Sequence, residues 1–146
     1  MIAPVFVDTN VFLYALDDAD QKKQQAARAW RRMLWVSRQG RVSYQVLQEF
    51  YVNVVRKYPS SRDQARDEIR DLEAWQPVIV DGDVLERGWN IQDRYRLSFW
   101  DALIVAAAAK ANCRYLLTED LQEDQELEGM RIVNPFHLAP EELPVH

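Results

Sequence analysis

Short apolar runs that end at polar residues alternate with helical segments along this 146-residue chain. Residues 4–7, 77–80, 115–117 and 131–133 have the length of buried strands. Strands separated by helices favour a parallel sheet, because a parallel pair needs a long crossover connection that a helix supplies. We therefore expect an α/β fold of three layers, α/β/α, with helices on both faces of a short, mostly parallel central sheet.

Apolar residues at helical spacing predict the connecting segments. Thr9 or Asn10 is expected to cap the first helix, Ser60 or Ser61 a charged helix, and Ser98 a nearly apolar helix. We expect helices after residue 8 and over residues 21–38, 44–57, 60–75, 84–95 and 98–111, with a minimal strand at 42–43.

The composition fits one globular domain over residues 1–146, with residues 137–146 as a mobile tail. Five Trp, six Tyr and five Phe supply the apolar area for a core. The first residues carry no basic leader before their apolar run. The longest apolar stretch, 102–109, is far shorter than the roughly 18 residues of a membrane helix. We expect a cytoplasmic protein that does not contact a membrane.

Several kinds of site are excluded by composition. The chain has four glycines, too far apart for a Walker A loop or a dinucleotide fingerprint. Cys113 is the only cysteine, which excludes a disulfide framework and a cysteine zinc site. The two histidines, His137 and His146, both lie in the last ten residues. Carboxylates are therefore the main candidates for chemistry.

Four carboxylates are the candidates, and two of them stand where ligands bind in parallel sheets. Asp8 comes directly after the first expected strand, and Asp120 just after the third. Ligands bind outside the carboxyl ends of such strands. Asp101 lies in the first turn of the helix that Ser98 opens, and Glu49 on the polar stripe of another helix.

Each of these acids also has a structural interpretation. Ser98 and Asp101 have the spacing of a capping box, Asp8 and Asp120 could be turn or cap residues, and Glu49 could be exposed. As a group, however, clustered carboxylates repel one another, and Mg²⁺ or Mn²⁺ is the usual remedy. Such ions activate water for attack on phosphorus, so metal-assisted hydrolysis is the chemistry that this composition favours.

Four segments resemble the acidic motifs of PIN-domain ribonucleases, and most closely those of the toxin in VapBC toxin–antitoxin pairs. The resemblance follows the family's order over residues 5–136. It implies a PIN-like fold, Mg²⁺ or Mn²⁺ as cofactor, and hydrolysis of RNA by activated water. The segments are FVDTNVFLYAL (6–16), QEFY (48–51), FWDALIVAAA (99–108) and LLTEDL (116–121).

The resemblance also implies roles for the four acids. Asp8 and Asp101 would be central metal ligands, Glu49 would complete the acidic pocket directly or through water, and Asp120 matches the family's T-x-D. Together they are the expected catalytic and metal-binding residues.

Neighbouring residues would support these acids. Thr9 and Asn10 would contact Asp8, and Thr118 would orient its loop. Some members carry a further Asp where this chain has Gln122. Asp124 or Glu119 could substitute for it, and whether the site takes one metal or two stays open.

Further expectations concern partners. The resemblance implies a homodimer and an antitoxin that covers the site, and one compact domain favours a toxin over a ribosome-processing nuclease. Residues 20–58 carry nine Lys or Arg against two acids. This basic segment could attract an RNA backbone, or it could be a solvated helix face or a surface docked on an acidic partner.

Two other classes remain as alternatives. A phospho-receiver domain also uses acids at strand ends, but it would need an acid beside Asp8, where Thr9 stands, and a Lys after a late strand, whereas Lys110 lies in a helix. A catalytically silent PIN-like module that only binds RNA or protein is the second, although the presence of all four acids argues against it.

Overall fold

The computed structural model describes residues 2–144, in which five short strands form one sheet in the order β2-β1-β3-β5-β4. The three pairs among β2, β1, β3 and β5 are parallel, and β4 runs antiparallel to β5. The strands are β1 (Val5–Val7), β2 (Gly40–Arg41), β3 (Tyr115–Leu117), β4 (Glu126–Leu127) and β5 (Met130–Val133).

The register brings the carboxyl ends of three strands to one edge. Val7 pairs with Leu117, and Leu117 pairs with Val133. Backbone hydrogen bonds continue one residue further, because the amide of Asp8 donates to the Leu117 carbonyl and the amide of Thr118 to the Val133 carbonyl, both at 3.0 Å. The residues that follow β1 and β3 therefore lie next to each other.

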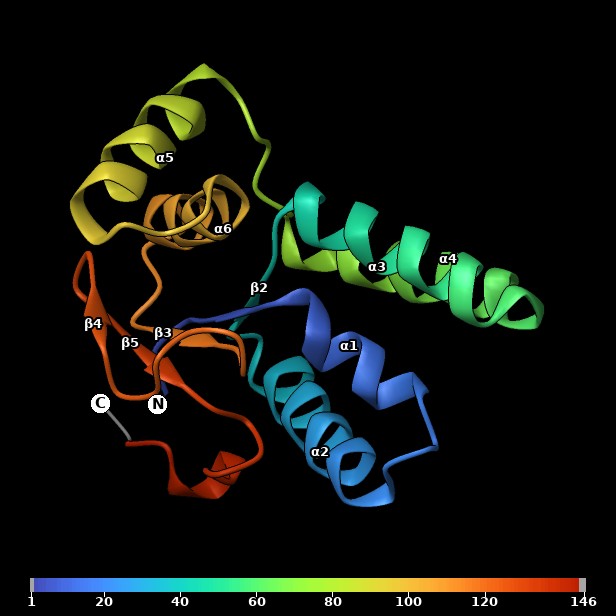
Figure 1. The fold of residues 1–146 in the computed structure, drawn as a ribbon. Helices are drawn as coiled ribbons and strands as arrows, with labels where there is room; N and C mark the ends of the chain where they lie inside the picture. Colours follow the sequence, from blue (N-terminus) through green and yellow to red (C-terminus); the bar gives the residue numbers. More distant parts are fainter. Residues whose placement is uncertain (1, 145–146) are drawn as a thin grey trace.

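Six helices and three 3₁₀ turns surround this sheet in the described part of the chain. Helices α5 and α6 lie on one side of the sheet, α1 and α2 lie on the other, and the paired α3 and α4 extend away from it (Figure 1). The predicted α/β class with helices on both faces is confirmed. The helices are α1 (Thr9–Leu16), α2 (Gln21–Ser37), α3 (Tyr44–Lys57), α4 (Arg62–Leu72), α5 (Gly82–Tyr95) and α6 (Phe99–Lys110), and the 3₁₀ turns are η1 (Pro59–Ser61), η2 (Glu73–Trp75) and η3 (Pro140–Glu142).

Helix α6 is the most buried helix, and its apolar sequence explains why. Every residue from Ala102 to Ala108 is buried, since α6 lies between α5 and the sheet (Figure 1). A helix that is apolar on all sides needs such cover on all sides. Among residues 2–144, no helix has the length and apolarity that crossing a membrane requires.

The last described residues are tied to the core. The buried indole of Trp30 donates from Nε1 to the carbonyl oxygens of Pro135, at 3.1 Å, and Leu138, at 3.0 Å, and Leu143 is buried. Two residues of the expected mobile tail, Leu138 and Leu143, therefore contact the rest of the fold. Residues 145 and 146 of that expected tail lie outside the described residues.

Two predicted strand positions are wrong, and one strand was not predicted. Residues 77–80 form only a single bridge from Val78 to Ser43, and Ile79 is exposed, because β2 already ends the sheet on that side. Pairing with β1 occurs at Gly40–Arg41 rather than at 42–43. Strand β4 was not predicted, and the Glu128-Gly129 turn that joins it to β5 has positive φ at both residues, as the tightest hairpins require.

Two predicted helix starts are corrected. Asp8 caps α1, in place of Thr9 or Asn10, and its carboxylate accepts from the Thr9 amide. The predicted helix over 60–75 is divided into η1, α4 and η2, and neither Ser60 nor Ser61 caps it with a side chain. Pro59 begins η1, and both serines lie within that 3₁₀ turn.

Gly40 gives a test of the packing beneath β2. A Cβ atom added there would lie 2.4–2.6 Å from three ring atoms of the buried Trp75. We predict that Gly40→Ala lowers the free energy of unfolding by about 1–3 kcal/mol, because the ring or the strand must move. Gly82→Ala is the matched control, since a Cβ there meets nothing within 4 Å. Urea unfolding measures both, and equal stability of the two variants would contradict the prediction.

Candidate active site

Asp8 joins the ends of β1 and β3. One carboxylate oxygen accepts from the amide of Thr9 at 2.7 Å and so caps α1. The other accepts from the hydroxyl of Thr118, which follows β3, at 2.8 Å. Asp8 and Thr118 are both buried, so neither group exchanges these partners freely with water. The cap interpretation of Asp8 is therefore right, but it describes only half of the contacts.

Glu49 reaches the same edge from α3. Its carboxylate accepts from the Thr9 hydroxyl at 3.0 Å and from Nε2 of Gln45, one turn earlier in α3, at 2.8 Å. The same Nε2 also donates to the carbonyl oxygen of Trp100 in α6 at 3.3 Å. Gln45 is buried and links Glu49 to the first turn of α6.

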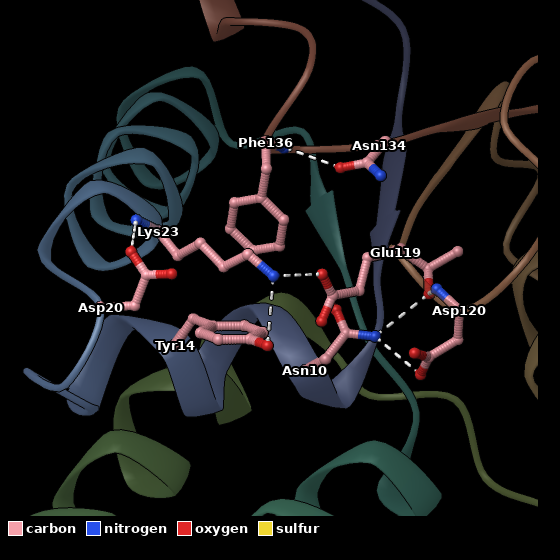
Figure 2. A network of polar contacts seen from close by, with 9 residues as sticks. Asn10, Tyr14, Asp20, Lys23, Glu119, Asp120, Asn134 and Phe136 are labelled. Atoms are coloured by element: carbon pink, nitrogen blue, oxygen red, sulfur yellow. Dashed lines mark hydrogen bonds and ion pairs between the residues drawn. The ribbon is translucent and has the colours of Figure 1, made fainter.

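Asp120 is held through Asn10 and Thr118. Nδ2 of Asn10 donates to the Asp120 carboxylate at 2.9 Å and to the Thr118 hydroxyl at 3.2 Å (Figure 2). The backbone amide of Asp120 donates to the same hydroxyl at 3.1 Å. Thr118 therefore donates to Asp8 and accepts from two partners, which connects Asp8 and Asp120 through one oxygen atom.

Asp101 lies at the border of this network. Its amide donates to the Ser98 hydroxyl at 3.1 Å, which is half of the predicted capping box. Its carboxylate is half-buried and has no hydrogen-bond partner within residues 2–144, so the cap does not use it. The neighbouring Trp100 carbonyl is the point at which Gln45 connects this turn to Glu49.

The oxygen atoms at this site are of the kind that binds a hard divalent cation. Asn10 Oδ1 and Gln45 Oε1 are buried oxygens with no hydrogen-bond partner, and both belong to residues that bind the candidate acids. An unpaired buried oxygen costs about 1–3 kcal/mol, and oxygen ligands are what Mg²⁺ and Mn²⁺ prefer. No three acidic, His or Cys side chains among the described residues are arranged as a ready ligand set. The site therefore fits a cation through the kind of ligand atoms that its residues offer.

Burial makes the charge of Asp8 unfavourable. The pKa of Asp8 is raised from 3.8 to about 6, mainly by desolvation, and the nearby charges of Asp120 and Glu49 act in the same direction. The hydrogen bonds from Thr118 and Thr9 favour the carboxylate and lower the pKa in part. A bound cation would oppose the desolvation and the repulsion together.

Glu119 and Asp124, which could have joined the acids, are paired elsewhere. Glu119 binds the ammonium of Lys23 at 2.9 Å (Figure 2). Asp124 lies 3.3 Å from the guanidinium of Arg131. Gln45 was not among the predicted site residues, although its position four residues before Glu49 on the same helix was an available signal.

The raised pKa of Asp8 predicts a pH dependence of stability in chelator. The folded state binds the Asp8 proton more tightly than the unfolded state, so ionisation weakens folding as pH rises from about 4 to about 6. We expect Asp8→Asn to gain up to about 3 kcal/mol relative to the wild type over that interval. Urea unfolding of both proteins in EDTA, from pH 4 to 7, measures the difference. Parallel stability curves would show that Asp8 is not destabilised by its charge.

Comparisons with known proteins identify the family and the fold of this chain. Residues 5–125 match the family model of the PIN domain. A toxin–antitoxin complex from Klebsiella pneumoniae is similar in structure, with a TM-score of 0.63, 22% identity, and coverage of 91% of this chain and 98% of that one. A comparison with curated proteins gives no significant match.

Two further solved structures share the fold. VapC20 from Mycobacterium tuberculosis, described as a sarcin-ricin loop cleaving toxin, has a TM-score of 0.60, 23% identity, and coverage of 77% of this chain and 86% of its own. VapBC2 from Rickettsia felis, bound to a DNA fragment from its promoter, has a TM-score of 0.60, 13% identity, and coverage of 88% and 96%. At these identities the structures show a common fold, whereas the family match covers most of this sequence. The chain belongs to the PIN domain family.

Proposed function

We propose that this protein is a metal-dependent endoribonuclease and the toxin of a toxin–antitoxin pair. The observation that carries the proposal is the connected network of Asp8, Glu49 and Asp120, which come from three distant parts of the sequence. Thr9, Thr118 and Asn10 join these acids at the carboxyl edge of a parallel sheet, where such folds bind ligands. Membership of the PIN domain family supports the same chemistry.

Each acid has a role in the proposed site. Asp8, Glu49, Asp101 and Asp120 would hold Mg²⁺ or Mn²⁺, which when bound supplies an activated water and neutralises charge on the leaving oxygen. The supporting side chains keep the carboxylates in place. Thr118 fixes Asp8 and the Asp120 backbone, Asn10 fixes the Asp120 carboxylate, and Gln45 holds Glu49 against the first turn of α6.

RNA is the proposed substrate. The proposed partners are a separately encoded antitoxin and a second copy of the chain, and the proposed location is the cytoplasm. The structural neighbours include a toxin–antitoxin complex and a toxin described as cleaving the sarcin-ricin loop. The basic segment, residues 20–58, keeps exposed charge at Arg32 and Lys57, which favours attraction of a phosphate backbone.

Asp101→Asn tests the site with little risk to the fold. Because the Asp101 carboxylate has no hydrogen-bond partner among residues 2–144, we expect the variant to keep its stability within about 0.5 kcal/mol. Cleavage of total RNA with Mn²⁺ or Mg²⁺ should fall below detection. Asp93→Asn, which changes an exposed acid on α5, should cleave as the wild type does. Chelation by EDTA should stop cleavage in both active proteins.

The possible outcomes separate the proposals. Cleavage that survives in Asp101→Asn would show that the site is assigned wrongly or that a contaminant cleaves. Absence of cleavage by folded, antitoxin-free wild type would overturn the nuclease and favour a PIN-like module that only binds RNA or protein.

A further inference from the structure

Lys23 lies outside the acidic site and points toward it. It belongs to the first turn of α2, where its amide donates to the capping carboxylate of Asp20 at 3.1 Å. Its ammonium donates to Glu119 at 2.9 Å and to the hydroxyl of Tyr14 at 3.4 Å (Figure 2). The side chain thus crosses from α2 to α1 and to the segment after β3.

Two aromatic rings hold the ammonium in place. The Lys23 nitrogen lies 4.6 Å from the ring centre of Tyr14 and 4.9 Å from that of Phe136. These rings meet edge to face, with their centres 5.0 Å apart. Cation–π attraction of this kind contributes about 0.5–1 kcal/mol at exposed sites and more where water is excluded. The side chains of Lys23 and Glu119 are only 33% and 21% exposed, so the ion pair is better shielded than one on the surface.

Glu119 lies between two residues of the candidate site. Thr118 donates to Asp8, and Asp120 accepts from Asn10. In Figure 2 the carboxylate of Glu119 is directed toward Lys23, and that of Asp120 lies on the other side of Asn10. The pairing with Lys23 therefore fixes the middle residue of a three-residue segment whose other two side chains bind the acidic network.

Helix α1 holds this segment at two points. Asn10 contacts Asp120 directly, and Tyr14, one helical turn later, contacts Lys23, which binds Glu119. If Lys23 lost its charge, Glu119 would lose the ammonium that balances its own charge, one residue before Asp120, and would keep the Tyr14 hydroxyl as a partner. It would then add repulsion to the site, and the segment would lose one of its two attachments.

We propose that Lys23 is a positioning residue that, by pairing with Glu119, sets the Asp120 carboxylate for cation binding and keeps Glu119 away from the cation. The cation-binding part of this inference rests on the proposed function. The attachment of the segment by Lys23 does not, and it can be measured without a metal.

Lys23→Met tests the role, because it keeps an apolar stem and removes the charge. Calorimetric titration of the RNA-free protein with Mn²⁺ should show affinity about 10-fold weaker or more, the usual cost of losing a group that supports a ligand. Lys22→Met is the matched control. Lys22 is the exposed neighbour on the same helix, and its side chain has no hydrogen bond or ion pair among the described residues, so the Mn²⁺ affinity of Lys22→Met should match that of the wild type. Lys23→Arg keeps the charge and should restore most of the affinity.

A double variant tests whether Lys23 acts through Glu119. Glu119→Gln removes the charge that Lys23 neutralises, so Lys23→Met should weaken Mn²⁺ binding much less in the Glu119→Gln background than in the wild type. Equal losses in both backgrounds would show that Lys23 acts by another route and would overturn the proposal.

Amide hydrogen exchange without metal gives the second readout. The Asp120 amide, which donates to the Thr118 hydroxyl, should exchange faster in Lys23→Met than in the wild type and Lys22→Met. Unchanged exchange together with unchanged Mn²⁺ affinity would overturn the proposal. Wild type that neither binds Mn²⁺ nor cleaves RNA would instead overturn the proposed function, and exchange would still decide whether Lys23 fixes the segment.

Discussion

The hydrogen bond between the Asp8 carboxylate and the Thr118 hydroxyl is the contact on which the rest of the site depends. It joins the ends of β1 and β3 at 2.8 Å, where both residues are buried. The second carboxylate oxygen of Asp8 caps α1, which sets the direction of the helix that carries Thr9 and Asn10. Through these two residues Glu49 and Asp120 are held, so one carboxylate orients the others.

This arrangement places a cost on folding. Burial and two neighbouring acids raise the pKa of Asp8, although a helix cap and a hydroxyl stabilise its charge. Two buried amide oxygens, on Asn10 and Gln45, are also left without partners. Local rules of stability are broken here together, as is expected where a site has been built for a ligand rather than for the fold. A cation would relieve the repulsion between the acids and act as a partner for the unpaired amide oxygens.

The sequence predicted correctly the elements that depend on their own local residues. The helix over 44–57 has the bounds expected from its apolar spacing, and Ser98 caps α6 as expected. The strand at 115–117 was found because its short apolar run has few alternatives. The run at 77–80 is equally apolar, but a strand also needs a partner, and the edge of the sheet offers it only Ser43.

The candidate acids were predictable for a related reason. Parallel strands end at the same edge of the sheet, and residues that follow the last apolar residue of each strand lie at that edge. The amino-acid pattern therefore places Asp8 and Asp120 at one edge. Gln45 could not be assigned a role, because its partners Glu49 and Trp100 meet only after α3 and α6 pack.

The number of basic residues in a segment overstates its positive field when some of them pair with acids from other parts of the fold. The nine basic residues of the segment 20–58 suggested a surface that attracts phosphate, but two of them are paired internally. Lys23 binds Glu119, and Arg31 binds Glu68 of α4, each from a distant part of the sequence. A paired, half-buried base contributes little long-range field, since its partner cancels the charge at a few ångströms. The field of this segment is therefore weaker than the count implies. The two paired bases serve instead to hold α4 and the 118–120 segment against α2.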